Sequence, residues 1–153
     1  MKKLSKIQLR ERMLKQLAAL EPQVFQDAGK KAAQILEPYF LESIALFKSL
    51  KNEVDTSLLI PNFKSVLLPD QNPEHYAQRI LEAKIKHVLI PGLAFDLQGH
   101  RLGRGLGYYD RCLAVLRKSA HCPEIIGLCL TQQVLTEIPV DSHDQTVDRL
   151  IEL

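Results

Sequence analysis

Two amphipathic helices are predicted at the start of the chain, where apolar residues recur at helical spacing. The first covers about residues 3–20 and carries Ile7, Leu14 and Leu17 on one face. The second begins near Pro22, since proline is favoured in the first turn of a helix, and ends near residue 37. Its apolar positions are Val24, Phe25, Ala28, Ala32 and Ile35. We expect each helix to bury its apolar face against a core.

Short apolar runs follow these helices and predict buried strands. The expected strands are residues 43–47, 65–69, 87–90 and 125–130, with a last one around 149–153. Further helices are expected between the strands. A brief one over residues 58–60 is capped by Asp55 or Thr56, and a short one covers residues 131–137. A longer helix runs from Pro73 to about Lys86 with Tyr76, Ile80 and Leu81 on its apolar face, and another follows Asp110 and carries Leu113 and Leu116.

The order of these elements predicts the fold class. Strands that are apolar throughout are buried on both faces, and strands that alternate with helices are typical of a mostly parallel sheet. We therefore predict an α/β protein with three layers, α/β/α, and a Rossmann-like sheet. Since the sequence contains no repeat, linker or low-complexity stretch, we expect one domain over residues 1–153.

Composition narrows the function classes. The chain is 46% hydrophobic and 25% charged, as in globular proteins, and its net charge of +2 argues against a nucleic-acid-binding protein. A nucleic-acid-binding module that uses the basic N-terminal helix remains an alternative, but no aromatic and basic platform accompanies it. The sequence shows no membrane span and no signal peptide, so we expect no membrane partner. The 3 cysteines lack zinc or disulfide spacing and indicate a cytoplasmic protein, with Cys112 and Cys129 in the core.

The segment RLGRGLGYYD, Arg101 to Asp110, carries the chemistry of the chain. It lies between a predicted strand and a predicted helix, where backbone N–H groups can converge on an anion. Glycines permit positive φ and close approach, arginines supply forked donors suited to phosphate, and an aspartate can hold Mg²⁺. The spacing is neither that of a P-loop nor that of the dinucleotide fingerprint. A flexible basic turn is the structural alternative, but the arginines and the aspartate favour a polyphosphate-binding loop.

Several blocks of this sequence resemble one family, that of 5-formyltetrahydrofolate cyclo-ligases. The most specific block is PGLAFDLQGHRLGRGLGYYDRCL, Pro91 to Leu113. KIQLR at Lys6–Arg10 resembles the N-terminal helix of the family, and NEVDT at Asn52–Thr56 resembles its Glu-containing segment. IIGLCLTQQVL, followed by IPVDSHDQTVD at Ile138–Asp148, resembles the C-terminal strand and its HDxxxD segment. The blocks occur in family order.

The resemblance implies a reaction. In the family, the formyl oxygen of 5-formyltetrahydrofolate attacks the γ-phosphate of ATP, N10 closes the ring, and 5,10-methenyltetrahydrofolate, ADP and phosphate are released. ATP is the co-substrate and Mg²⁺ the metal. Such phosphoryl transfer depends on positioning and charge neutralisation more than on a covalent catalyst. A monomer is expected.

The resemblance also implies site residues. Those expected to bind ATP are Lys6, Arg10, Arg101, Leu102, Gly103, Arg104, Gly105, Leu106, Gly107, Tyr108 and Tyr109. Those expected to bind folate are Glu53, Arg104, Gly105, Leu106, Gly107 and Tyr108. Asp110 and Asp144 are expected to bind Mg²⁺, and Arg104, Tyr108 and Asp110 are the expected catalytic residues.

Taken without the resemblance, several of these residues allow a structural interpretation. Lys6 and Arg10 share one helix face that could simply be solvated, and Glu53 could be an acid that leads a helix. Asp110 could cap the following helix and Asp144 could be a turn residue, with Asp148 as a further metal candidate. His100 and His143 are expected to be loop residues, because neither has a second histidine at metal spacing.

The middle of the chain departs from the family pattern. The family carries a Met-x-Phe segment and a GIxEP segment that help to wall the folate pocket. Here Met occurs only at positions 1 and 13, and no glycine lies between Gly29 and Gly92. Leu106 also stands where the family often has lysine. The alternative function is therefore a nucleotide-binding member of the family that has lost folate turnover.

Overall fold

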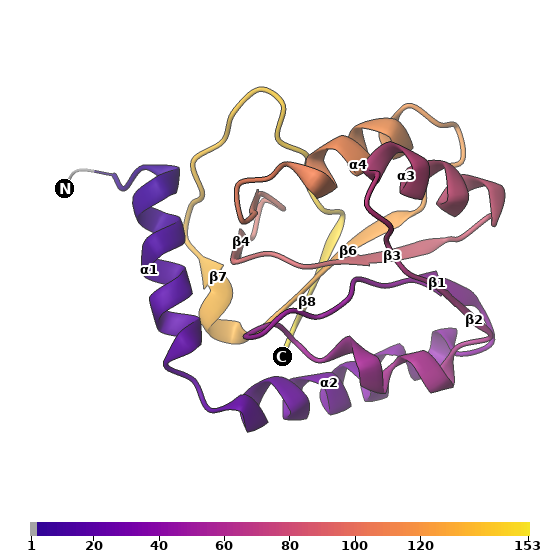
Figure 1. Ribbon diagram of the computed structural model, residues 1–153, viewed down its shortest axis with the longest axis horizontal. Coiled ribbons are helices and arrows are strands. Elements are labelled where there is room, and N and C mark those ends of the chain that lie inside the picture. Colours follow the sequence, from indigo (N-terminus) through magenta and orange to yellow (C-terminus); the bar gives the residue numbers. More distant parts are fainter. Residues whose placement is uncertain (1–2) are drawn as a thin grey trace.

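The protein, described over residues 3–153 by a computed structural model, is built around a parallel sheet of five strands with helices on both faces (Figure 1). In spatial order the strands are β2 (Ser65–Leu67), β1 (Ser43–Ala45), β3 (His87–Ile90), β6 (Glu124–Cys129) and β8 (Arg149–Glu152). Each neighbouring pair is parallel. The predicted three-layer α/β class with a Rossmann-like sheet is confirmed.

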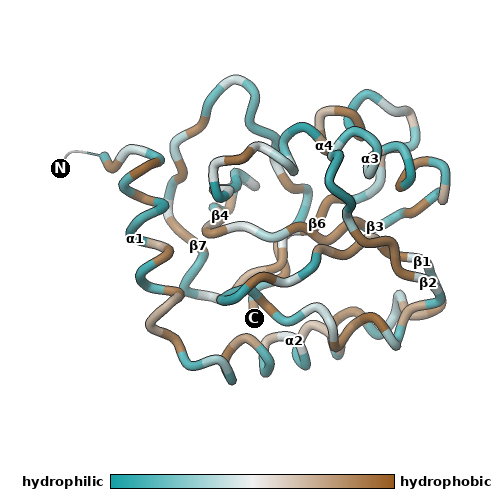
Figure 2. The backbone as a smooth tube through the Cα atoms, in the orientation of Figure 1, coloured by the Kyte–Doolittle hydropathy of each residue, from teal (hydrophilic) through white to brown (hydrophobic). Residues whose placement is uncertain are grey.

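The continuous apolar runs arise because the sheet is buried on both faces. On β3, Val88 and Ile90 pack into the core under α3 and α4, whereas Leu89 between them packs into the core over α1 and α2. Side chains alternate between the two faces of a strand, so both faces need apolar residues. Figure 2 shows the resulting hydrophobic colour along the central strands β1, β3 and β6.

Within residues 3–153, four α-helices form the outer layers (Figure 1). α2 (Pro22–Leu36) lies along one face of the sheet, with α1 (Lys6–Ala18) upright beside it at one end. α3 (Pro73–Glu82) and α4 (Tyr108–Arg117) pack together on the opposite face. Among residues 3–153, none of the helices is long and apolar enough to cross a membrane.

The buried face of α1 differs from the predicted one. Leu9, Met13 and Leu17 are buried, whereas Ile7 is 67% exposed and Leu14 is also exposed. The helix packs through Leu9, Met13 and Leu17, a stripe with four-residue spacing, because these residues meet the apolar side chains of the sheet and of α2. Lys6 and Arg10 stand one turn apart on the same side as this stripe, so packing of α1 turns both toward the interior.

Other predicted elements also differ in detail. On α2, Leu36 is buried in place of the predicted Ile35, which is exposed. The brief helix over 58–60 is a pair of 3-10 turns, Thr56–Leu58 and Ile60–Asn62, and Asp55 caps the first of them. The short helix over 131–137 is one 3-10 turn, Thr131–Gln133, followed by strand β7 (Val134–Leu135). Cys112 and Cys129 are buried as predicted.

A second, three-stranded sheet was not predicted. It consists of β5 (Arg101–Leu102), β4 (Ala94–Asp96) and β7. The buried carboxylate of Asp96 holds it together by accepting bonds from His100 Nδ1 (2.9 Å) and from the amide of Ile138 (3.1 Å). The side chain of Gln133 donates to the carbonyl of Gly92 at 2.8 Å. These bonds hold Arg101 on a strand at the start of the glycine loop.

Gly29 provides a test of how α2 positions the segment after β1. A Cβ at this position would overlap the carbonyl oxygen of Asp55, whose amide donates to the carbonyl of Phe25 at 3.1 Å. Gly29→Ala gains about 1 kcal/mol of helix propensity, but the overlap with a fixed backbone outweighs it. We expect a loss of about 1–3 kcal/mol in the free energy of unfolding, measured by urea titration. The exposed Gln34→Ala on the same helix serves as control and should stay within about 0.5 kcal/mol of the parent. Equal stability of Gly29→Ala and the parent would contradict this close packing.

Candidate active site

A cavity of about 530 Å³ opens beyond the carboxyl ends of β1, β2 and β3. The chain runs from β1 to β2 on one side and places β3 on the other side of β1, so the direction of winding reverses between β1 and β3. Open α/β sheets bind their ligands at such a reversal, because the loops on its two sides diverge and leave a crevice.

The cavity brings together every site residue expected from the sequence. Its wall includes Lys6, Arg10, Glu53, the whole glycine loop from Arg101 to Tyr109, Asp110 and Asp144. Sequence reasoning missed other lining residues: Lys48, Leu50, Pro69, Asp70, Gln71, Pro91, Gly92 and Asp141. His143, which was expected to be only a loop residue, also lines the cavity. Many of the missed residues directly follow β1, β2 or β3, so their place at a carboxyl end was the signal that could have found them.

The glycine loop leaves space for a ligand beside its backbone. Gly105 and Gly107 have φ values of 104° and 69°, in the region that favours glycine. A Cβ on Gly107 would meet nothing within 4 Å, and this residue begins α4 without a side-chain cap. The amides of the first turn, from Tyr108 to Asp110, therefore have no capping side chain and suit an anion. Arg10 closes the loop from the other side, since its Nε donates to the carbonyl of Gly103 at 2.9 Å.

Arg101 lies under this loop with only 5% of its side chain exposed. Its Nη1 donates to the carbonyl of Pro91 at 3.1 Å, its Nη2 lies 3.5 Å from Asp110 Oδ2, and its guanidinium stacks over the ring of Tyr109. Burial lowers the pKa of Arg101 although Asp110 opposes the effect, and an arginine still remains charged at neutral pH. Its Nε has no partner among residues 3–153. A buried guanidinium with a free donor fits an anionic ligand.

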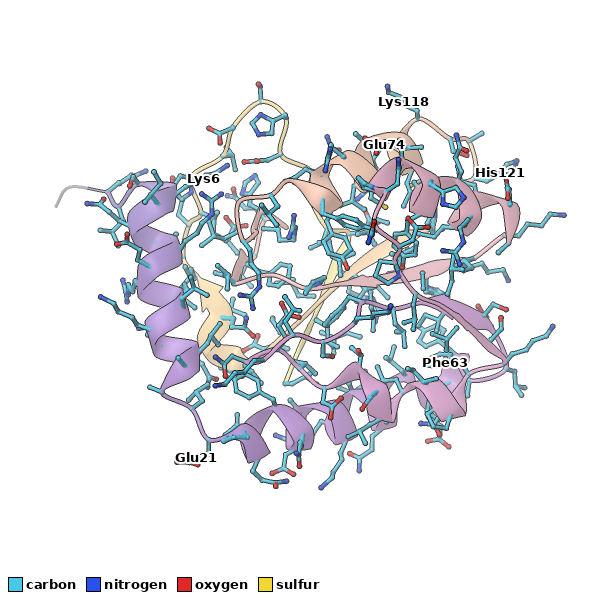
Figure 3. The ribbon with its side chains drawn as sticks, viewed as in Figure 1. Lys6, Glu21, Phe63, Glu74, Lys118 and His121 are labelled. Atoms are coloured by element: carbon cyan, nitrogen blue, oxygen red, sulfur yellow. The ribbon has the colours of Figure 1, made fainter. Side chains whose placement is uncertain are left out.

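Lys6 projects from the inner side of α1 (Figure 3). Its ammonium pairs with Asp141 Oδ2 at 2.6 Å and with Asp144. Burial of the ammonium lowers the pKa of Lys6, but the bonds to the two carboxylates outweigh burial and raise it overall. Burial of Asp144 likewise opposes its ionisation, but the bonds from Lys6 and from the amide of Asp141 lower the pKa of Asp144 overall. Both partners are therefore charged at neutral pH.

Glu53 contacts Arg104 directly in the cavity wall. Its Oε1 lies 3.2 Å from Arg104 Nε, and its Oε2 accepts a bond from the amide of Leu50 at 2.8 Å. The turn from Ser49 to Thr56, which contains Glu53, is fixed by the amide of Thr56, which donates to Ser49 Oγ at 2.8 Å. The residue types of the NEVDT block thus build a tight turn that presents one carboxylate, rather than an acid that leads a helix.

Asp110 and Asp144 both line the cavity and come from two segments that are tied together. Asp110 Oδ1 accepts a bond from the amide of Gln145 at 3.1 Å, which ties α4 to the loop that carries Asp144. Carboxylate oxygens of Asp141 and Asp144 and a ring nitrogen of His143 lie within 4.8 Å of one another. Oxygen donors of this kind suit Mg²⁺.

Of the remaining candidates, Asp148 and His100 have structural partners outside this cavity wall. Asp148 accepts from the amide of Ile125 at 2.7 Å and pairs with Arg117 at 3.0 Å, so it secures β6 and α4. His100 is bound to Asp96, as expected for a loop histidine. His143 lines the cavity but is 74% exposed on its side chain.

Fold and site together define an α/β protein with a cavity lined by a glycine loop and several cationic side chains at the reversal point of a parallel sheet. The sequence model of the 5-formyltetrahydrofolate cyclo-ligase family matches residues 48–152. The chain belongs to this family.

Individual relatives agree with this assignment. The 5-formyltetrahydrofolate cyclo-ligase of Escherichia coli is 30% identical over 162 residues, which span 82% of this chain and 88% of that protein. The mouse 5-formyltetrahydrofolate cyclo-ligase is 42% identical over 65 residues, or 42% of this chain and 32% of that protein. This chain therefore matches only about a third of the length of the first curated relatives. A 5,10-methenyltetrahydrofolate synthetase from Mycoplasma pneumoniae has a similar structure, with 25% identity, a TM-score of 0.72 and coverage of 97% and 98% of the two chains.

The pairing of Lys6 predicts a pH-dependent contribution to stability. Because the pKa of Asp144 is lowered in the fold, its contribution is present above the ordinary value of about 4 and disappears as the pH falls through the lowered value. Because the pKa of Lys6 is raised, its contribution is present below its ordinary value of about 10.4 and is lost at higher pH. We expect Lys6→Met to reduce the free energy of unfolding by about 1 kcal/mol at neutral pH and by almost nothing near pH 2.

Urea titration at both pH values measures this difference. The control is Lys15→Met, which changes an exposed lysine on the same helix and should have little effect at either pH. A loss for Lys6→Met that is the same at pH 2 and pH 7 would mean that the lysine stabilises the fold by packing rather than by charge.

Proposed function

We propose that the protein is an ATP- and Mg²⁺-dependent 5-formyltetrahydrofolate cyclo-ligase that forms 5,10-methenyltetrahydrofolate, ADP and phosphate. The observation that carries the proposal is that one cavity gathers the complete glycine loop, the Lys6–Arg10 helix face, Glu53 and Asp144. The matching family model and the names of the relatives support the same activity. We further propose a single-domain, cytoplasmic monomer, in which the lining of one cavity contains all of the proposed site residues.

ATP would bind along the glycine loop and the inner side of α1. The amides at the start of α4, together with Lys6, Arg10, Arg101 and Arg104, supply donors and positive charge for its phosphates. The glycines at the tip of the loop, Gly103, Gly105 and Gly107, have no side chain and let a phosphate approach the backbone closely. Phosphoryl transfer needs such charge placed before the reaction begins, since charge then need not be reorganised as the transition state forms.

The folate would occupy the part of the cavity beside Glu53 and the loop residues Arg104 to Tyr108. The carboxylate of Glu53 is held by the amide of Leu50 and can accept bonds from the N–H groups of a pterin ring. Leu50 and Leu106 are 56% and 86% exposed, and both line the cavity, so they offer apolar contact to an aromatic substrate. Burial raises the pKa of Tyr108 to about 12, so its hydroxyl is neutral and donates to the carbonyl of Asp70, which fixes the ring beside the cavity.

Asp110 and Asp144 fit Mg²⁺ by their chemistry. Their carboxylates come from two tied segments and face the same cavity as the proposed phosphate donors, and Mg²⁺ is held by one or two carboxylates together with phosphate oxygens and waters. When bound, the ion would neutralise phosphate charge. Lys6 is charged and already adjacent to Asp144, so it can neutralise the same region from the side of α1.

The reaction would then proceed in two steps, in each of which one bond forms and one breaks. The formyl oxygen forms a bond to the γ-phosphorus while the bond to ADP breaks, and N10 then forms a bond to the formyl carbon while the carbon–oxygen bond to phosphate breaks. N10 loses its proton, which leaves with phosphate. The protein contributes position and charge: Glu53 and Tyr108 orient the folate, and Arg104 lies beside Glu53 where the transferred phosphoryl group would pass.

Turnover is tested by mixing the protein with Mg·ATP and 5-formyltetrahydrofolate and recording the near-UV absorbance of the methenyl product. We expect product with the parent protein and a fall of about 10²- to 10³-fold in kcat/KM with Arg104→Ala, which removes a charged donor. The control is Arg111→Ala, an exposed arginine on α4 outside the cavity wall, and its kinetics should equal those of the parent.

Calorimetric titration with Mg·ATP separates the cyclo-ligase from the alternative family member that only binds nucleotide. Binding without product formation would favour the alternative, and binding of neither nucleotide nor folate would reject both. An unchanged nucleotide affinity in Arg104→Ala would show that the loop is not the ATP site.

The metal assignment is tested by Asp110→Asn, which keeps the shape of the side chain but removes its charge. Mn²⁺, which accepts the same oxygen ligands, serves as a spectroscopic probe in the presence of ATP. We expect at least tenfold weaker Mn²⁺ binding in the variant, and parent-like binding in Asp27→Asn, an exposed control on α2. Parent-like binding in Asp110→Asn would remove this residue from the metal site.

A further inference from the structure

The connection from β2 to α3 forms one wall of the cavity, although the sequence lacks the family segments expected there. Pro69, Asp70 and Gln71 all line the cavity. The hydroxyl of Tyr108 donates to the carbonyl of Asp70 at 2.6 Å, so this connection is bonded directly to the glycine loop. A short turn thus forms this wall of the cavity in a chain that lacks the Met-x-Phe and GIxEP segments.

The side chain of Asp70 fixes the turn from behind. Its carboxylate accepts bonds from the amide of Asn72 (2.9 Å), from His75 Nδ1 (2.8 Å) and from Arg79 Nη1 (3.0 Å). Burial opposes ionisation of Asp70, but these bonds lower its pKa overall, so the carboxylate is charged at neutral pH. Asn72 also caps α3 by accepting from the amide of His75 at 2.8 Å. The turn is therefore anchored to α3 rather than loose.

Gln71 is the exposed polar side chain on this anchored turn. The side-chain amide of Gln71 makes no hydrogen bond among residues 3–153, whereas its neighbours Asp70 and Asn72 do. A side-chain amide offers two donors and an acceptor, and a ring system with mixed donors and acceptors can use both. The fixed backbone reduces the ordering that such a bond requires.

The contacts of the turn place it beside the folate part of the cavity. Asp70 is bonded to Tyr108, whose ring packs against Tyr109 and Tyr76 with centroids 5.1 and 6.4 Å apart. Lys6, one of the cations proposed for the phosphates, instead pairs with Asp141 and Asp144. Gln71 directly follows Asp70 and lines the same cavity.

We propose that Gln71 is a substrate-binding residue that hydrogen-bonds the folate, and that Asp70 and Arg79 are positioning residues that hold it there. The inference rests on the proposed cyclo-ligase function and assigns part of the folate wall to residues of this chain. It accounts for a folate pocket without the Met-x-Phe and GIxEP segments.

The first test compares Gln71→Ala with Gln78→Ala, an exposed glutamine on α3 outside the cavity wall. Loss of one neutral hydrogen bond should raise the KM for 5-formyltetrahydrofolate about three- to tenfold in Gln71→Ala, with Mg·ATP affinity by calorimetry unchanged. Gln78→Ala should equal the parent in both measurements. An unchanged folate KM, or a change confined to ATP affinity, would overturn the proposal.

The second test addresses the positioning residues. Arg79→Met removes the bond to the Asp70 carboxylate and should also raise the folate KM, while Arg79→Lys, which keeps the charge, should restore part of the loss. Thermal unfolding of each variant shows whether a KM change has a merely structural origin, since a destabilised fold would weaken ATP binding as well. Parent-like folate KM in a folded Arg79→Met would remove Asp70 and Arg79 from the proposal.

Calorimetry of the parent with 5-formyltetrahydrofolate separates this inference from the proposed function. If the parent neither binds nor converts the folate, the proposed function fails and this inference fails with it. If the parent is active and Gln71→Ala matches it, only this inference fails.

Discussion

The ion pairs from Lys6 to Asp141 and Asp144 join the two ends of the chain and close one side of the cavity. They hold α1 against the loop after β7, and α1 in turn presents Arg10 to the carbonyl of Gly103. A partly buried ammonium needs such partners, because removing charge from water is costly unless it is paired. The glycine loop is thus held from α1 as well as from its own strand and helix.

The same rule governs the rest of the cavity. Arg101 lies against Asp110 and Arg104 against Glu53, so each of these cations has a carboxylate neighbour. The pairs connect segments far apart in sequence, which gives the cavity its shape without a ligand. A polar cavity organised in this way suits phosphoryl transfer, in which fixed charge matters more than a covalent nucleophile.

The middle of the chain shows how a shorter connection can serve the same fold. The absence of two family segments suggested a member that had lost folate turnover, but the comparisons give no support to that loss. In the structure the chain passes from β2 to α3 through a short turn that lines the cavity and is bonded to Tyr108. Asp70 anchors this turn through bonds to α3. No motif in the sequence predicts that Asp70 has this structural role.

The sequence by itself determined the fold class and the position of the glycine loop. Apolar runs alternating with amphipathic helices follow from burial of a parallel sheet on both faces, and the glycines and arginines of residues 101–107 reflect local backbone and charge requirements. Only the tertiary structure decided the inward face of α1, the second sheet around Asp96, and the places of Asp70, Gln71 and Asp141 in the cavity wall. These depend on contacts between distant segments, and the spacing of residues along a single segment carries no information about which distant partner it will meet.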